Sequence, residues 1–163
     1  MSISREIKPL DSTRSHGARN RPGSPPLASF DTEISALTGL PDGGAAAGLV
    51  DGRIVFIGGQ HAGRTLAPIA DITCITALIP ARDGTLLIAN GSASNGPDAW
   101  KRDLMEKNAS GSLWRVEPAG SAPRRLAGNL AYPYGLLEEA DSIVISESWR
   151  CALTRVSPGA SGR

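Results

Sequence analysis

Side chains that could do chemistry stand at the ends of two β-rich segments of this sequence. Asn90 and Ser92 close the segment LLIANGS, and Glu147 and Ser148 close the segment IVISES. A carboxylate such as Glu147 can act as a general base when apolar surroundings raise its pKa, and an amide such as Asn90 can orient substrate or water. Alternatively, Asn90 and Ser92 are turn residues that bond to their own backbone, and Glu147 is a solvated strand end.

A glycine-rich stretch offers a second kind of chemistry. The run GGQHAGRT, Gly58 to Thr65, follows the strand-like RIVFI and imitates a phosphate-cradling GxxxxGK[ST] loop, with Arg64 in place of the lysine. Pro68 stands where the required helix should be running, so a hairpin is the preferred interpretation. His61 is expected to be an exposed turn residue, because no Cys, Asp or Glu lies near it in the sequence.

The segments that contain these residues resemble one another in sequence and form an internal repeat. The segments Cys74–Ser92 and Leu130–Val156 share an apolar strand, a turn marked by Asp with Gly or Ser, and a second strand that ends in small polar residues. A weaker third copy runs over Ala45–Gly59, with its turn at Asp51 and Gly52. This pattern predicts a repeated β-meander. The expected strands are 45–50, 53–58, 64–69, 74–80, 85–90, 112–117, 123–128, 134–138, 142–147 and 152–157.

One short helix is expected within residues 95–109, inserted between two strands. Asn95 can cap it, Pro97 suits its first turn, and Gly111 follows its end. Trp100 and Leu104 lie on one face of this helix, and this apolar face is expected to pack against another part of the protein. Opposite charges recur at helical spacing in two pairs: Asp98 with Arg102 and Asp103 with Lys107.

Composition favours one ordinary globular domain. The chain has 163 residues, 40% of them hydrophobic, and a net charge of +1 without a basic stripe, so nucleic acid and a membrane are not expected partners. Residues 1–30 read as a disordered tail, with a transit peptide as the less favoured interpretation. Because a secretory signal is lacking, the expected location is the cytoplasm. Cys74 and Cys151 are expected to be buried, reduced thiols.

A succession of four-stranded β-meanders along a sequence is typical of β-propeller blades. Residues 31–163 are therefore expected to form an all-β, incomplete β-propeller, with blades over about 45–70, 74–128 and 132–163. About four blades is the smallest number that closes a propeller ring, and the strands of this chain stop within the third.

The span from TLLIANGS to the end of SESWRCALTRV resembles the strictosidine synthase-like proteins and the senescence marker protein/gluconolactonase family, which are six-bladed propellers of the NHL type. The resemblance covers about residues 71–157. One blade of that family contains a Gly-x-Leu-x-Arg strand, a Leu-x-Phe-Pro-Asn-Gly-Val-Ala-Leu segment and a strand that ends in Glu-Thr. In this sequence the corresponding segments are Gly111–Arg115, Leu130–Leu137 and Ile143–Ser148.

The resemblance implies a site on the top face, where inner strands begin and second strands end. It places Glu147 and Asn90 there as catalytic residues, below a lid formed by the inserted helix. The residues expected to bind substrate are Tyr134, Thr76, Trp149 and Trp100, with Ser92 and Ser148 beside them. Relatives often hold a divalent cation such as Ca²⁺ on the axis. Here Thr76 and Tyr134 occupy the ligand positions and suit a hard cation poorly, so no metal ligand is assigned.

Two functions follow from this resemblance. The first is hydrolysis of small esters or lactones by a truncated member of the family. The second is a non-catalytic propeller fragment or a half-propeller that associates with another copy, because open blade edges invite pairing.

Overall fold

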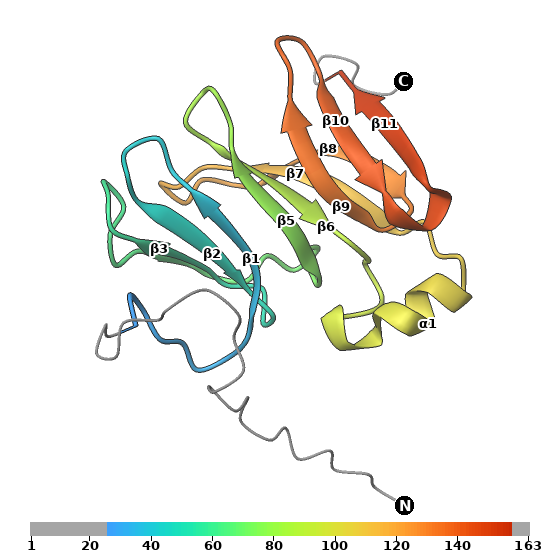
Figure 1. Cartoon of the computed structure of the whole chain (residues 1–163), viewed down its shortest axis with the longest axis horizontal. Coiled ribbons are helices and arrows are strands. Elements are labelled where there is room, and N and C mark those ends of the chain that lie inside the picture. The colour runs from blue at the N-terminus through green and yellow to red at the C-terminus, as the bar shows by residue number, and fades with distance from the viewer. Residues whose placement is uncertain (1–25, 158–163) are drawn as a thin grey trace, which may run out of the picture.

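The computed structural model describes residues 26–157, which form three antiparallel sheets, one short inserted helical segment and a 3₁₀ turn in the third sheet (Figure 1). The first sheet has the order β1-β2-β3-β4, with β1 Ile34–Gly39, β2 Ala45–Leu49, β3 Ile54–Ile57 and β4 Thr65–Leu66. The second has the order β5-β6-β7-β8, with β5 Ile75–Pro80, β6 Leu86–Asn90, β7 Gly111–Val116 and β8 Arg124–Leu130. The third has the order β11-β10-β9, with β9 Pro133–Glu138, β10 Ile143–Glu147 and β11 Ala152–Val156.

The first strand of each sheet lies next to the first strand of the neighbouring sheet. Strand β1 contacts β5, and β5 contacts β9, so these inner strands are successive neighbours although each starts a different sheet (Figure 1). Each sheet then leads away from its inner strand through successive antiparallel strands, which are joined by turns except between β6 and β7, where the helical segment is inserted. The polar strand ends of different sheets are thereby brought to one side of the molecule.

Two apolar cores join the three sheets. Phe56 and Ile54 of the first sheet pack with Ile88 of the second, and on the other face Leu87 packs with Ile145 of the third. Every residue of β6 is buried, because both faces of the second sheet are covered. That coverage explains why LLIA is a continuous apolar run without the polar alternation of a half-exposed strand.

The inner strands repeat one irregularity. Each carries a one-residue register shift near its start, which leaves Ser35, Thr76 and Tyr134 without a partner opposite. Such β-bulges increase the local twist of a strand. The three sheets are therefore copies of one unit in their backbone geometry as well as in their sequence pattern.

The hairpin turns of the first two sheets are also alike. Asp42 and Asp83 each accept a hydrogen bond from the backbone N–H two residues further on, at 2.9 and 3.1 Å. The glycine that follows each aspartate, Gly43 or Gly84, has a φ of 84°, which a residue with a side chain rarely adopts. The first repeat thus has its turn at Asp42, and the repeat predicted over 45–59 began one strand too late.

Sheet boundaries differ from the sequence prediction mainly at the start. Strand β1 was not predicted, so the first sheet spans 34–66 and not 45–70. The second sheet spans 75–130, and the third spans 133–156. Residues 1–25 of the predicted tail and residues 158–163 lie outside the described residues. Within residues 26–157 no helix is long and apolar enough to span a bilayer.

The inserted helical segment is shorter than predicted. It consists of the 3₁₀ turn η1, Pro97–Ala99, and the helix α1, Trp100–Met105. Neither has a side-chain cap, so the capping role predicted for Asn95 is wrong. The predicted ion pairs are replaced by one between Arg102 and Glu106. Of the two free thiols, Cys74 is buried as expected, but Cys151 is exposed.

Candidate functional site

Five residues line a cavity of about 410 Å³ between the inserted helix and the third sheet. They are Trp100 of α1, Tyr132 and Tyr134 at the start of β9, and Ser148 and Trp149 of the 3₁₀ turn η2, Ser148–Arg150. Trp149 is the central ring: its centroid lies 4.3 Å from that of Tyr132 and 6.3 Å from that of Trp100, with interplanar angles of 28° and 29°. The cavity is lined mainly by aromatic surface, which suits a flat or apolar ring.

Three of the four residues predicted to bind substrate line this cavity. Trp100 and Tyr134 are 42% and 59% exposed, so their rings are accessible to a ligand. Tyr132 was not predicted, although it lies beside the predicted residue Tyr134 in LAYPYG. The fourth predicted residue, Thr76, does not line the cavity.

Tyr132 has an unusual backbone. Its φ is 54°, a left-handed value that is uncommon for a bulky aromatic residue and costs roughly 1–2 kcal/mol. The conformation is held by neighbours: Ser148 N–H donates to the Tyr132 carbonyl at 3.1 Å, and Trp149 N–H donates to the Ala131 carbonyl at 3.3 Å. Burial, and then the nearby Cys74 thiol, raise the pKa of the Tyr132 phenol well above its usual range. The phenol therefore stays protonated and serves as a ring surface.

The carboxylate of Glu147 is bonded to this strained segment and accepts hydrogen bonds from three donors. Its side chain is 2% exposed, and its Oε2 accepts from Ala131 N–H at 2.6 Å and from Arg150 Nη1 at 2.7 Å. The Thr154 hydroxyl donates to Oε1. Burial alone would raise the pKa of Glu147, but the Ala131, Thr154 and Arg150 donors outweigh it and lower the pKa. This direction is opposite to the upward tuning expected of a general base.

Asn90 and Thr76 have their polar groups directed at backbone. Asn90 is fully buried; its Oδ1 accepts from Cys74 N–H at 2.9 Å, and its Nδ2 donates to the Asp71 carbonyl at 3.2 Å. Thr76 Oγ1 lies 2.5 Å from the Pro133 carbonyl, which ties the second sheet to the third. Both residues stand at the strand ends where the resemblance placed them, and neither lines the cavity.

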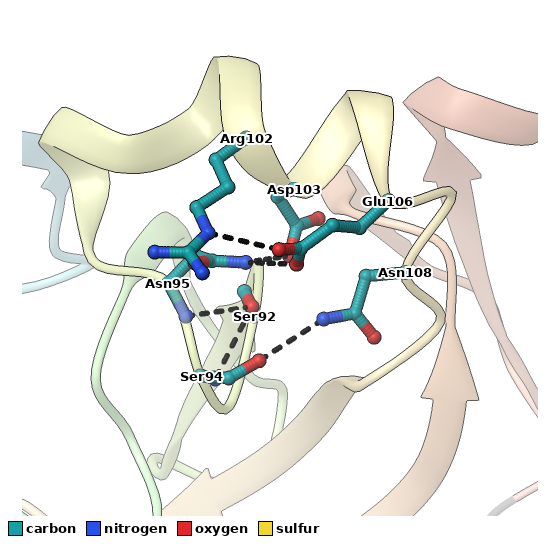
Figure 2. Close-up of polar contacts among 7 residues, drawn as sticks. All are labelled: Ser92, Ser94, Asn95, Arg102, Asp103, Glu106 and Asn108. Atoms are coloured by element: carbon teal, nitrogen blue, oxygen red, sulfur yellow. Dashed lines mark hydrogen bonds and ion pairs between the residues drawn. The ribbon is translucent and has the colours of Figure 1, made fainter.

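A polar network fastens the inserted helix above the sheet (Figure 2). Ser92 Oγ accepts the N–H of Ser94 at 3.3 Å and that of Asn95 at 3.1 Å. Asn95 Nδ2 then donates to Asp103 at 3.1 Å and to Glu106 at 3.2 Å (Figure 2). Ser92, which was predicted to lie on the top face, thus anchors the lid, whereas the sequence pattern had paired Asp103 with Lys107.

The divalent cation implied by the resemblance does not fit the residues present. The three bulged positions at the starts of the inner strands hold Ser35, Thr76 and Tyr134, which offer hydroxyl groups and no carboxylate. A hard cation prefers carboxylate and carbonyl oxygens. Within residues 26–157, no three His, Cys, Asp or Glu side chains gather in a way that could hold a metal ion.

The glycine-rich stretch is a turn and does not lead into a helix. Residues 58–64 join β3 to β4, with Gly58 and Gly59 at φ values of 65° and 63°. The His61 ring is half-buried in this turn and packs against Phe56, with 5.4 Å between the ring centroids. A phosphate loop needs a helix N-terminus directly after it, and here a strand follows.

Comparison with known proteins gives matches at the level of structure. The fold is similar to virginiamycin B lyase from Staphylococcus aureus, a β-propeller enzyme, with a TM-score of 0.55 and 17% identity over 78% of this chain. It is also similar to a catalytically inactive variant of that enzyme with quinupristin, with a TM-score of 0.53 and 16% identity over 82% of this chain. No family model and no curated protein matches the sequence.

The fold is an incomplete β-propeller. The chain spans about two fifths of the length of the two lyase structures, 39% and 40%. At these identities the likeness shows the fold alone. The three sheets are therefore propeller blades, and the aromatic cavity lies at the end of the blades where the inner strands begin.

Proposed function

We propose that the aromatic cavity binds a small molecule with a flat ring, and that the chain belongs to a propeller hydrolase that cleaves small esters or lactones. The observation that carries the proposal is the set of aromatic residues in one cavity, Trp100, Tyr132, Tyr134 and Trp149. The resemblance to the strictosidine synthase-like/gluconolactonase family supports the ester or lactone as substrate. The position of the cavity at the starts of the inner strands agrees with the site that this resemblance implies.

Hydrolysis would need a base in addition to the aromatic surface. A water oxygen adds to the acyl carbon while the base accepts the water proton; the bond from carbon to the leaving oxygen then breaks, and the base returns the proton to that oxygen. The resemblance implies Glu147 as this base, but Glu147 does not line the cavity, and Ala131 and Thr154 hold its carboxylate in addition to Arg150. The described contacts of Glu147 are anchoring contacts, so ligand binding is the part of the proposal that the geometry supports best.

The test uses two probes of the same shape. Dihydrocoumarin is an aromatic lactone, and chroman is the same bicyclic ring without the carbonyl group. Both are expected to quench tryptophan fluorescence, because Trp100 and Trp149 line the cavity. Replacing the exposed Tyr134 by alanine should raise the Kd of both probes about three- to tenfold, the usual contribution of one aromatic contact. Leu153→Ala is the matched control, since Leu153 is 75% exposed and lies outside the cavity.

The outcomes separate binding from hydrolysis. Absence of quenching by both probes overturns the binding proposal. Quenching together with release of the ring-opened acid, lost in Glu147→Gln, supports the hydrolase. Quenching without any turnover of dihydrocoumarin contradicts hydrolysis and leaves a binding protein.

A second function, association with another copy of this chain, is favoured by two open sheet faces. Leu137 and Leu153 are 59% and 75% exposed, and the pairing register puts both on the face of the third sheet opposite the buried Ile145. At the other end, Leu37 of β1 is 66% exposed. Within the chain, faces of this kind are covered by a neighbouring sheet.

Sedimentation velocity tests this association. The chain should form a dimer or larger species, and Leu137→Glu should return it to a monomer because a charge cannot be buried unpaired in the contact. Leu27→Glu is the control, since Leu27 is 87% exposed and lies outside the sheets. A parent chain that sediments as a monomer at all concentrations contradicts self-association.

A further inference from the structure

Asp103 is a buried carboxylate that connects the inserted helix to the third sheet. It is 1% exposed, although it lies on a short surface helix. Its Oδ1 accepts from Asn95 Nδ2 at 3.1 Å, and its Oδ2 accepts from the indole Nε1 of Trp149 at 2.8 Å. Within residues 26–157 it takes part in no salt bridge, so both of its oxygens are satisfied by neutral donors.

The two hydrogen bonds of Asp103 have different tasks. The bond from Asn95 belongs to the network that holds α1 to its own sheet through Ser92 (Figure 2). The bond from Trp149 spans 46 residues of sequence and reaches the η2 turn of another sheet. A six-residue helix is too short to be stable alone, so some anchoring is required, but the Asn95 side already supplies it.

Trp149 is the ring on which the geometry of the cavity depends. It stacks on Tyr132 and lies near Trp100, and all three rings line the cavity, so any rotation of its indole changes the cavity wall. Stacking alone leaves a ring free to slide, whereas a hydrogen bond at one edge fixes its orientation. The N–H that would otherwise be unsatisfied inside the structure is the one that Asp103 accepts.

We propose that Asp103 is the positioning residue of the aromatic site: its carboxylate fixes the Trp149 indole and thereby the shape of the cavity under α1. This inference rests on the proposed ligand-binding function. Asp103 does not line the cavity, so it acts through Trp149 and does not contact the ligand. Asp103 also connects the lid helix α1 directly to the site, because this side chain belongs to α1 and accepts the hydrogen bond of Trp149, which lies under α1.

The first experiment needs no ligand. The chain has three tryptophans, so an ¹H–¹⁵N spectrum shows three indole signals, and that of Trp149 is identified by its loss in Trp149→Phe. In Asp103→Leu, which keeps the shape but removes both acceptors, hydrogen exchange of the Trp149 indole should be at least tenfold faster. In Asp103→Asn the exchange rate of the Trp149 indole should lie between those of the parent chain and Asp103→Leu, because the asparagine keeps one acceptor oxygen. The indole of Trp114, bonded to Ser112 Oγ at 2.8 Å, serves as the unchanged reference.

The second experiment measures binding of dihydrocoumarin and chroman to the same variants. Asp103→Leu should raise the Kd of both probes about tenfold. The matched control is Asp98→Leu, which makes the same change at an exposed residue of the same insertion and should leave the Kd within twofold. A purely structural role would lower the melting temperature of Asp103→Leu without changing the Kd measured well below it.

Each result decides one of the two proposals. If the parent chain binds neither probe, the ligand-binding function fails, and the exchange experiment still tests the hold of Asp103 on Trp149. If the parent binds and Asp103→Leu binds equally well, with unchanged indole exchange, the positioning role is overturned. Should Asp103→Leu not fold, Asp103→Asn takes its place, because it keeps the shape of the side chain and weakens the acceptor; indole exchange of Trp149 and the Kd must then both rise, and unchanged values of both contradict the proposal.

Discussion

The second and third sheets use different side chains to hold the segment that leads into their inner strand. In both, the last residue of the second strand holds the segment that leads into the inner strand: Asn90 accepts the N–H of Cys74, and Glu147 accepts that of Ala131. In the first sheet the apolar Leu49 stands at the matching place, opposite the start of β1. A polar residue at this position therefore has an anchoring task, and its presence alone does not mark a catalytic group.

The difference between the two anchors lies in what they hold. Asn90 secures the buried Cys74, whereas Glu147 secures the segment in which Tyr132 adopts its left-handed backbone and lines the cavity. An ionised acceptor makes a stronger hydrogen bond than a neutral one. The stronger anchor is thus found at the more strained segment.

Removing the stronger anchor should have the largest effect. Glu147→Ala leaves the Ala131 N–H and the Arg150 guanidinium without their acceptor, so the free energy of unfolding should fall by about 3 kcal/mol. Urea denaturation measures this change. Glu117→Ala, at an exposed position, is the control and should stay within about 0.5 kcal/mol of the parent. A loss as small as that of the control would remove Glu147 as an anchor.

Replacing the anchor of the second sheet by the residue type of the first sheet should lower the free energy of unfolding by a smaller amount. Asn90→Leu introduces the residue type found at Leu49 but leaves the Cys74 N–H unsatisfied, so the free energy of unfolding should fall by about 2 kcal/mol. The same denaturation experiment applies, with Gln60→Leu as the control for an exposed amide. If Asn90→Leu is as stable as the parent, the two sheets do not share the anchoring device.

Acid titration tests the charge on the third-sheet anchor. Donors lower the pKa of Glu147 below its ordinary value of 4.5, so its charge stabilises the fold above that value, and the contribution is lost as the pH falls through the lowered pKa. Glu147→Gln should therefore cost about 1 kcal/mol at pH 7, and the gap should close in acid. A gap that stays constant from pH 7 to pH 3 would contradict a charged anchor.

The smallest effect is expected on the lid surface. The Arg102–Glu106 pair is a solvent-exposed contact one helical turn apart, with the arginine side chain 75% exposed. Arg102→Ala should lower the free energy of unfolding by about 0.3 kcal/mol and leave probe binding unchanged. A large loss of binding would show that α1 is held by its surface charges and not by the buried Asp103.

The strand pattern predicted most of the fold, because alternation and turn residues act locally. Strand β1 was missed since ISALTG is weakly apolar, and its place depends on packing against β5. Trp100, Tyr134 and Trp149, named as substrate-binding residues from the resemblance, line one cavity, and their binding role stays a prediction. The role of Asp103 could not be predicted, because its partner Trp149 is distant in sequence and the nearby Lys107 offered a local alternative.

The bulged residue of each inner strand has a practical consequence for protein engineering. Ser35, Thr76 and Tyr134 have no residue paired opposite them, but only Tyr134, 59% exposed, has a side chain open to solvent, whereas Thr76 is buried and bonded to the Pro133 carbonyl. Three residues as different as serine, threonine and tyrosine already occupy this place. Substituting Tyr134 in the third sheet is therefore a direct way to install a new ligand or reactive group beside the cavity without changing the strand register.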